Sequence, residues 1–129
     1  ALSDLDQDGD DDILYTNGDA FDYIPPQGRP WHGVQWLENQ GNLKFEFHRI
    51  CSFTGATNVR PADVDNDGDL DLFAVSAFNI WDNPKSSSFI WLENDGNQNF
   101  VKREITKNPT QEILFPPTLL LDLPCPAAH

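Results

Sequence analysis

Short apolar runs recur along the chain, and polar or glycine-containing segments separate them. The runs are rich in β-branched and aromatic residues, as is typical of strands. In residues 99–105, a strand would direct Phe100, Lys102 and Glu104 to one face and Val101, Arg103 and Ile105 to the other. No stretch combines helical periodicity with capping residues, so the sequence predicts an all-β fold. The expected strands cover residues 13–16, 34–38, 43–50, 57–64, 70–77, 89–93 and 99–105.

Turn signals between these runs predict antiparallel hairpins. The segments "NQGN" and "NDGN" each join two strand-like runs, and Asp95-Gly96 favours a tight turn. Pro61 lies inside one run, and proline cannot donate a hydrogen bond within a sheet. Residues 57–64 are therefore expected at the edge of their sheet or at a bulge.

The chain contains an internal repeat. The segment "DLDQDGDDDI" at Asp4 returns as "DVDNDGDLDL" at Asp63, an offset of 59, and "WLENQGNLKFEFHRI" at Trp36 returns as "WLENDGNQNFVKREI" at Trp91, an offset of 55. Each unit would hold four short antiparallel strands, and such units repeated radially form propeller blades. We expect a partial blade at residues 1–56, a complete blade at 57–107 and a divergent Pro-rich tail at 108–129.

Negative charge is concentrated in two loops. The formal net charge is -13, and eleven of the 21 acidic residues lie within residues 4–12 and 63–71. An acidic surface repels phosphates, which argues against a nucleic acid partner, and no apolar run is long enough to span a membrane. A merely solvated acidic loop would not need aspartate at every second position. Neighbouring carboxylates raise one another's pKa, so the pattern indicates a bound cation.

The alternating aspartates fit a calcium loop. Calcium takes six to eight oxygen ligands, and side chains at loop positions 1, 3 and 5 converge when glycine at position 6 allows a sharp turn. Position 7 contributes a backbone carbonyl, and position 9 a further carboxylate. Magnesium prefers to retain waters, and zinc lacks its preferred thiolate and imidazole ligands here. The candidate ligands are Asp4, Asp6, Asp8, Asp10 and Asp12 in the first loop, and Asp63, Asp65, Asp67, Asp69 and Asp71 in the second.

An EF-hand shares the first half of this pattern. It then requires glutamate at position 12 and flanking helices, whereas position 12 is Tyr15 in one loop and Ala74 in the other. The EF-hand and the related dockerin are therefore disfavoured.

The two acidic loops, each followed by "WLEN" and a Gly–Phe spacing, resemble FG-GAP/VCBS-type repeats across about residues 3–107. Such repeats are similar to the blades of the integrin α-subunit propeller and of many secreted bacterial proteins. The resemblance implies a calcium-stabilised β-propeller, usually of seven blades, with the ion in the loop between the first two strands of a blade. Asp10 and Asp69 would act through their carbonyls, and the calcium would be mainly structural.

The chain departs from this family pattern in three respects. It holds one complete unit and most of another, so we expect a fragment or a processed piece that cannot close a propeller alone. The first blade is expected to lack its first strand, and the tail does not continue the repeat. Open blades leave unpaired strand edges, so we expect neighbouring blades or self-association.

Other candidate residues lie outside the acidic loops. Phe21, Tyr23, Trp31 and His32 occupy a long loop and Trp81 its counterpart, where aromatic side chains suit carbohydrate or protein recognition or simply pack. The recurring Trp36, Trp91, Phe45, Phe100, Leu37 and Leu92 are expected to pack between blades. The sequence does not decide whether Cys51 and Cys125 pair or stay free.

No catalytic set is recognisable. His32 and His48 lack an activated serine, because Ser86, Ser87 and Ser88 lie in a plain polar run. The expected function is thus a non-enzymatic calcium-binding scaffold for binding or adhesion, located outside the cytoplasm, where calcium is abundant. The alternative is a non-catalytic or scaffold part of a secreted carbohydrate-active enzyme, or a lectin-like sugar-binding module. A calcium-responsive switch would need a bistable element that the sequence does not indicate.

Overall fold

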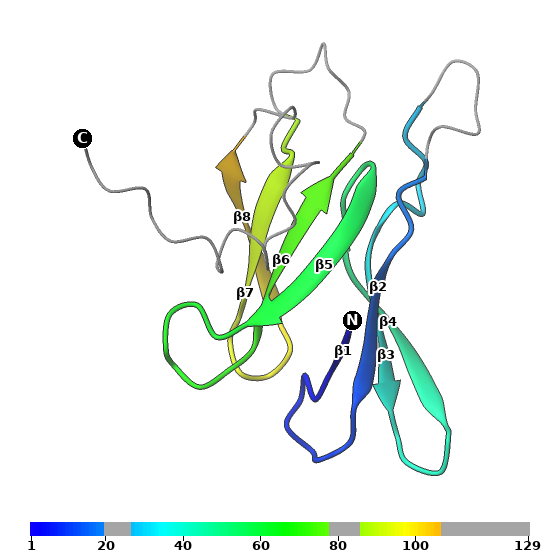
Figure 1. Cartoon of the computed structure of the whole chain (residues 1–129), viewed down its shortest axis with the longest axis vertical. Coiled ribbons are helices and arrows are strands. Elements are labelled where there is room, and N and C mark those ends of the chain that lie inside the picture. The colour runs from blue at the N-terminus through cyan, green and yellow to red at the C-terminus, as the bar shows by residue number, and fades with distance from the viewer. Residues whose placement is uncertain (20–26, 78–85, 107–129) are drawn as a thin grey trace, which may run out of the picture.

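The chain forms two four-stranded antiparallel sheets, which confirms the all-β, blade-like fold (Figure 1). The computed structural model describes residues 1–19, 27–77 and 86–106. The strand order is β1-β2-β3-β4 in the first sheet, here called blade 1, and β5-β6-β7-β8 in the second, blade 2. The strands are β1 (Leu2–Ser3), β2 (Asp12–Thr16), β3 (Gly33–Asn39), β4 (Phe45–Ser52), β5 (Ala56–Ala62), β6 (Asp71–Ser76), β7 (Phe89–Asn94) and β8 (Phe100–Thr106).

Blade 1 has four strands, so the expectation that its first strand is missing is wrong. Leu2 and Ser3 pair with Ile13 and Asp12 of β2. Two residues carry too little apolar pattern to be recognised as a strand, and only pairing with β2 reveals them. In blade 2, Pro61 lies in β5, which is an edge strand as predicted.

The core lies between the two sheets. In blade 1, Leu14 is paired with Trp36, so both side chains are on one face, and this face is buried. In blade 2, Leu72 is paired with Leu92 on a second buried face. These residues belong to one apolar cluster, so the two faces pack against each other.

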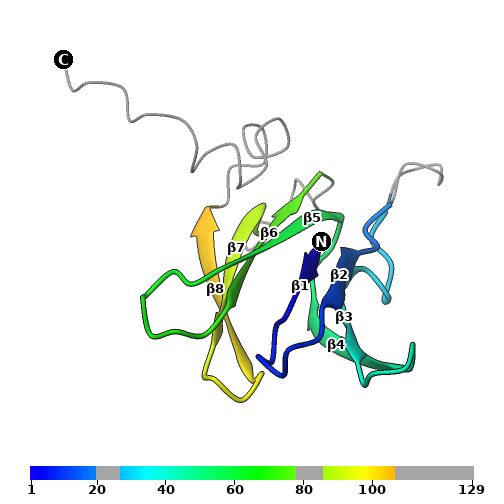
Figure 2. The same ribbon diagram turned by 60° about the horizontal axis from the view of Figure 1, so that its bottom comes forward.

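The repeat shows that the faces in contact are not equivalent ones. By the offsets of 59 and 55, Leu14 and Trp36 correspond to Phe73 and Trp91, which lie on the opposite face of blade 2 from Leu72 and Leu92. Blade 1 therefore packs its Trp36 face against the non-Trp face of blade 2. The sheets stack head to tail, as successive blades of a propeller do (Figure 2). Among the described residues, no strand covers the other face of either sheet, here called its open face.

No helix in the described part of the chain is long and apolar enough to cross a membrane.

Candidate metal centres

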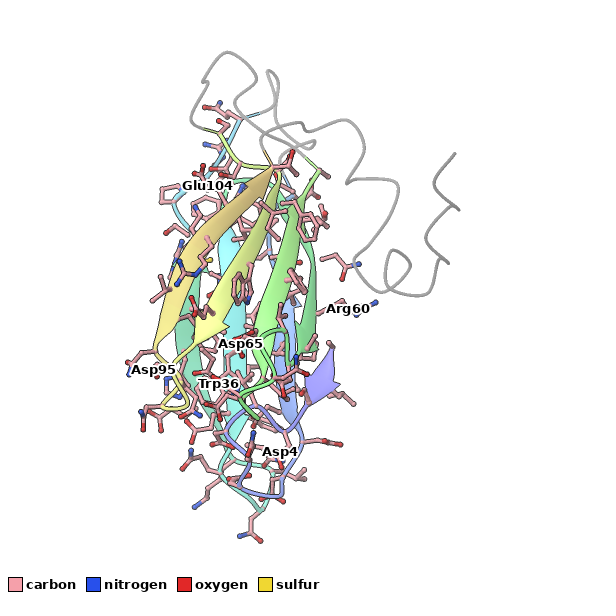
Figure 3. All side chains as sticks on the ribbon, turned by 90° about the vertical axis from the view of Figure 1, so that its left-hand side faces the viewer. Asp4, Trp36, Arg60, Asp65, Asp95 and Glu104 are labelled. Carbon is pink, nitrogen blue, oxygen red and sulfur yellow. The ribbon has the colours of Figure 1, made fainter. Side chains whose placement is uncertain are left out.

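The two acidic loops occupy the same position in their blades. Residues 4–11 join β1 to β2, and residues 63–70 join β5 to β6. Both loops lie at the same end of the stacked sheets, where Asp4 and Asp65 mark them in Figure 3. The loops also contact each other, because Gln7 Nε2 donates a hydrogen bond to the carbonyl oxygen of Gly68 at 2.7 Å.

Three carboxylates converge in each loop. One oxygen each from Asp4, Asp6 and Asp8 lies within 4.8 Å of the others. Asp63, Asp65 and Asp67 form the same arrangement in the second loop. Two oxygens that are each about 2.4 Å from a shared calcium ion are at most about 4.8 Å apart. Each set of three is therefore compact enough to share one ion.

The backbone of both loops takes the same unusual shape. Gly9 has a φ of 99° and Gly68 a φ of 97°, a left-handed region that glycine enters without strain. A Cβ at either glycine would meet no atom within 4 Å, so the backbone angle rather than space requires glycine there. Gln7 and Asn66, at position 4 of each loop, also have positive φ values of 60° and 62°, a feature that the sequence did not predict.

Backbone amides hold the carboxylates in place. In the first loop, Asp8 N donates to Asp4 Oδ1 and Gly9 N donates to Asp4 Oδ2, both at 3.0 Å. In the second loop, Gly68 N donates to Asp63 Oδ2 at 3.2 Å. A carboxylate oxygen has two acceptor sites, so each retains one for a cation.

Asp12 and Asp71 lie outside the two sets of three and anchor the loops, while their predicted role as ligands at position 9 stays a prediction. Asp12 is fully buried, and its two oxygens accept hydrogen bonds from Leu5 N at 3.0 Å and Asn39 N at 2.8 Å. Asp71 is also buried and accepts from Val64 N at 3.4 Å and Asn94 N at 2.8 Å. Each carboxylate thus joins the acidic loop to the end of the third strand of its blade.

Asp10 and Asp69 direct their side chains towards the neighbouring hairpin turns. A Cβ at Gly41 would lie 3.7 Å from Asp10 Oδ2, and a Cβ at Gly96 would collide with Asp69 Oδ2. Gly96 therefore permits the close approach of the β7–β8 turn to the second loop. Ligation through the carbonyls of Asp10 and Asp69 stays a prediction.

Two asparagines complete the connection, and the sequence did not predict their role. Asn39 Nδ2 donates to the carbonyl of Asp11 at 3.1 Å, and Asn39 Oδ1 accepts from Gly41 N at 3.0 Å. Asn94 makes the equivalent bonds to Leu70 O and Gly96 N, both at 3.1 Å. Their recurrence in the two "WLEN" segments was the available signal.

Repulsion between neighbouring carboxylates destabilises the compact form of each acidic loop. The pKa of Asp6 is raised above its ordinary value of 3.8, first by desolvation and then by the charges of Asp12 and Asp8. The pKa of Asp65 is raised as well, first by partial desolvation and then by other carboxylates of its loop. The ionised form of each group is thus disfavoured unless a cation is close.

The other candidate residues are only partly described. Trp31 is 51% exposed, whereas His32 is buried, accepts a hydrogen bond from Gly55 N at Nδ1 and has its pKa lowered by desolvation. Cys51 is half-buried, forms no disulfide within the described residues, and burial raises the pKa of its thiol. Phe21, Tyr23, Trp81 and Cys125 lie outside the described residues, so their predicted roles and any Cys51–Cys125 pairing stay open.

A family model for the FG-GAP-like repeat matches residues 4–74, which is more than half of the chain. The chain belongs to the FG-GAP-like repeat family. The match begins at the first ligand position of the first acidic loop and ends after the second loop, so both loops lie within it. The chain is therefore a β-propeller-like repeat module. No curated protein and no solved structure matches it.

Proposed function

We propose that this FG-GAP-like module binds two calcium ions, one in each acidic loop. The observation that carries the proposal is the convergence of three aspartate oxygens within 4.8 Å in both loops. The repeated glycine geometry and the amide bonds to the carboxylates support it, because they fix the turn and the carboxylate positions in both loops.

The proposed role of calcium is structural. Each loop is tied to the third strand of its blade through a buried aspartate and an asparagine, so a cation that neutralises the loop also stabilises the sheet. We propose a non-enzymatic binding or adhesion scaffold that works outside the cytoplasm. Extracellular calcium modules bind at about 10⁻⁴–10⁻³ M, a concentration of free calcium that the cytoplasm does not supply.

Isothermal titration with calcium tests the ion sites directly. We expect two sites in the wild-type chain and one site in each of Asp6→Asn and Asp65→Asn. Asp11→Asn is the matched control, because this exposed aspartate adjoins the first loop but is not a candidate ligand, and it should retain two sites. Heat from magnesium equal to that from calcium, or two sites remaining in both loop variants, would contradict the proposal.

We further propose that the two open faces are covered by flanking blades or by a second copy. On blade 1 the open face carries Phe45 and Phe47, which are 43% and 57% exposed. On blade 2 it carries half-buried Phe73, Phe89 and Trp91. By the repeat, the open face of blade 1 corresponds to the packed face of blade 2, and the open face of blade 2 corresponds to the packed face of blade 1. The two open faces are therefore complementary, and we expect them to pack head to tail in the same way.

Sedimentation velocity in calcium tests this stacking. We expect the wild-type mass to grow with concentration, because a head-to-tail contact does not close on itself. Phe47→Glu and Phe73→Glu should each be monomeric alone, whereas their mixture should form dimers and nothing larger, because one intact face of each kind remains. A monomeric wild type at every concentration, or a mixture that stays monomeric, would refute stacking by a second copy.

A further inference from the structure

A second type of ligand cluster lies on the β3–β4 hairpin of blade 1, separate from the acidic loops. Glu38, Glu46 and His48 each place one ligand atom within 4.8 Å of the others. His48 Nε2 and Glu38 Oε2 are 2.6 Å apart, and their side chains are 34% and 20% exposed. The imidazole is held in place by Trp36, whose ring stacks on it at 4.5 Å between centroids.

Blade 2 holds a different set of residues at the positions equivalent to this cluster. By the offset of 55, the three residues correspond to Glu93, Val101 and Arg103. Arg103 pairs with Glu93 and lies 5.5 Å from the centre of the Trp91 ring. In blade 2 this position thus holds a permanent cation, one carboxylate and a tryptophan, with no second carboxylate.

Blade 1 differs from that arrangement at two positions, and both changes introduce metal ligands. The arginine is replaced by an imidazole, which offers a lone pair, and the valine is replaced by a second carboxylate. Glu38 and Glu46 are direct partners in the β3–β4 register. Like charges directly opposite each other destabilise a strand pair, so a cation shared by Glu38 and Glu46 would stabilise this one.

We propose that Glu38, Glu46 and His48 bind a divalent transition metal of the zinc class. One imidazole nitrogen and two carboxylate oxygens at about 2.0–2.2 Å form a three-ligand zinc site that keeps a position for water. Ligands of a tetrahedral ion at such distances are about 3.3–3.6 Å apart, so the cluster needs small side-chain shifts only. Calcium is the weaker candidate here because it prefers oxygen ligands throughout.

The test is titration with Zn²⁺ in excess calcium, so that the aspartate loops are already filled. We expect one zinc site in the wild-type chain and no measurable site in Glu46→Val/His48→Arg, which copies the residues of blade 2 into blade 1. The loss should be complete in the measurable range, because removal of a residue that merely supports a zinc ligand already costs about 10–100-fold in affinity. Co²⁺ should give a visible absorption band in the wild type that the double variant lacks.

The reverse graft makes the test symmetrical. Val101→Glu/Arg103→His places the three ligands of blade 1 in blade 2 and should raise the zinc stoichiometry from one to two. Thermal melts in calcium check that both double variants remain folded. The proposal is overturned if the Glu46→Val/His48→Arg chain still binds zinc, or if Asp6→Asn removes the site instead. The zinc and calcium proposals can be tested separately, because each set of variants leaves the other ligands unchanged and calcium is present in excess.

Discussion

Saturating calcium is expected to raise the midpoint of thermal unfolding by roughly 10 °C or more relative to EDTA, whereas magnesium should raise it little. A ligand present at about 10–100 times its dissociation constant stabilises the folded state by about 1.4–2.7 kcal/mol for each site. Two sites thus contribute about 3–5 kcal/mol, and each kcal/mol moves the midpoint of a chain of this size by several degrees. Circular dichroism and tryptophan fluorescence measure the melts.

Single-site variants divide this gain between the loops. Asp6→Ala and Asp65→Ala should each remove about half of the rise, because each takes one carboxylate from a different set of three. Asp11→Ala should retain the full rise. Three superimposable melts in calcium, magnesium and EDTA would remove the basis for a structural ion.

The effect of Asp6→Asn should change sign when calcium is removed. The folded pKa of Asp6 is raised, so in EDTA its ionised form weakens the fold, and that loss of stability develops as the pH rises through the folded pKa. Asp6→Asn should therefore be more stable than the wild type in EDTA at pH 7. This advantage should vanish below the ordinary pKa of 3.8, where the aspartate is protonated in both states. Urea unfolding at several pH values measures the difference.

The sequence predicted the blades well because their signals are local and occur twice. The strand-like run at residues 99–105 and the Asp95-Gly96 turn correspond to β8 and its hairpin. Pro61 correctly predicted an edge strand, since a missing amide donor excludes a central position. The sharp turn at Gly9 and Gly68 was also predictable, because the ligand spacing requires a residue that accepts positive φ.

The features that were not predicted depend on pairing across the fold. β1 has only two residues, and it is defined by its register with β2 rather than by its own pattern. The spacing of aspartates predicted Asp12 as a ligand at position 9, but it did not indicate that Asp12 is buried and accepts hydrogen bonds from two amides of separate segments. No periodicity in a single segment shows which carboxylate will meet Asn39 N. The placement of Glu38 directly opposite Glu46 likewise depends on the register between β3 and β4.

Replacing the anchoring aspartates is expected to cost more than removing a loop ligand, and the cost should persist without calcium. Asp12→Ala leaves the amides of Leu5 and Asn39 without their acceptor, and Asp71→Ala does the same to Val64 and Asn94. An unsatisfied buried donor costs about 1–3 kcal/mol, so each variant should lose about 2–5 kcal/mol of unfolding free energy. Urea unfolding in EDTA measures this loss.

The two anchors should differ in a predictable order. Both bonds of Asp12 are short, at 3.0 and 2.8 Å, whereas the bond from Val64 N to Asp71 is 3.4 Å long, so Asp12→Ala should be the more damaging change. Asp12→Asn keeps one acceptor oxygen and should recover about half of the loss, and Asp11→Ala should cost little. If Asp12→Ala were neutral in EDTA but harmful in calcium, Asp12 would act as an ion ligand and not as an anchor. If Asp12→Ala loses the same unfolding free energy in EDTA and in calcium, Asp12 acts as an anchor that holds the loop against the third strand of its blade.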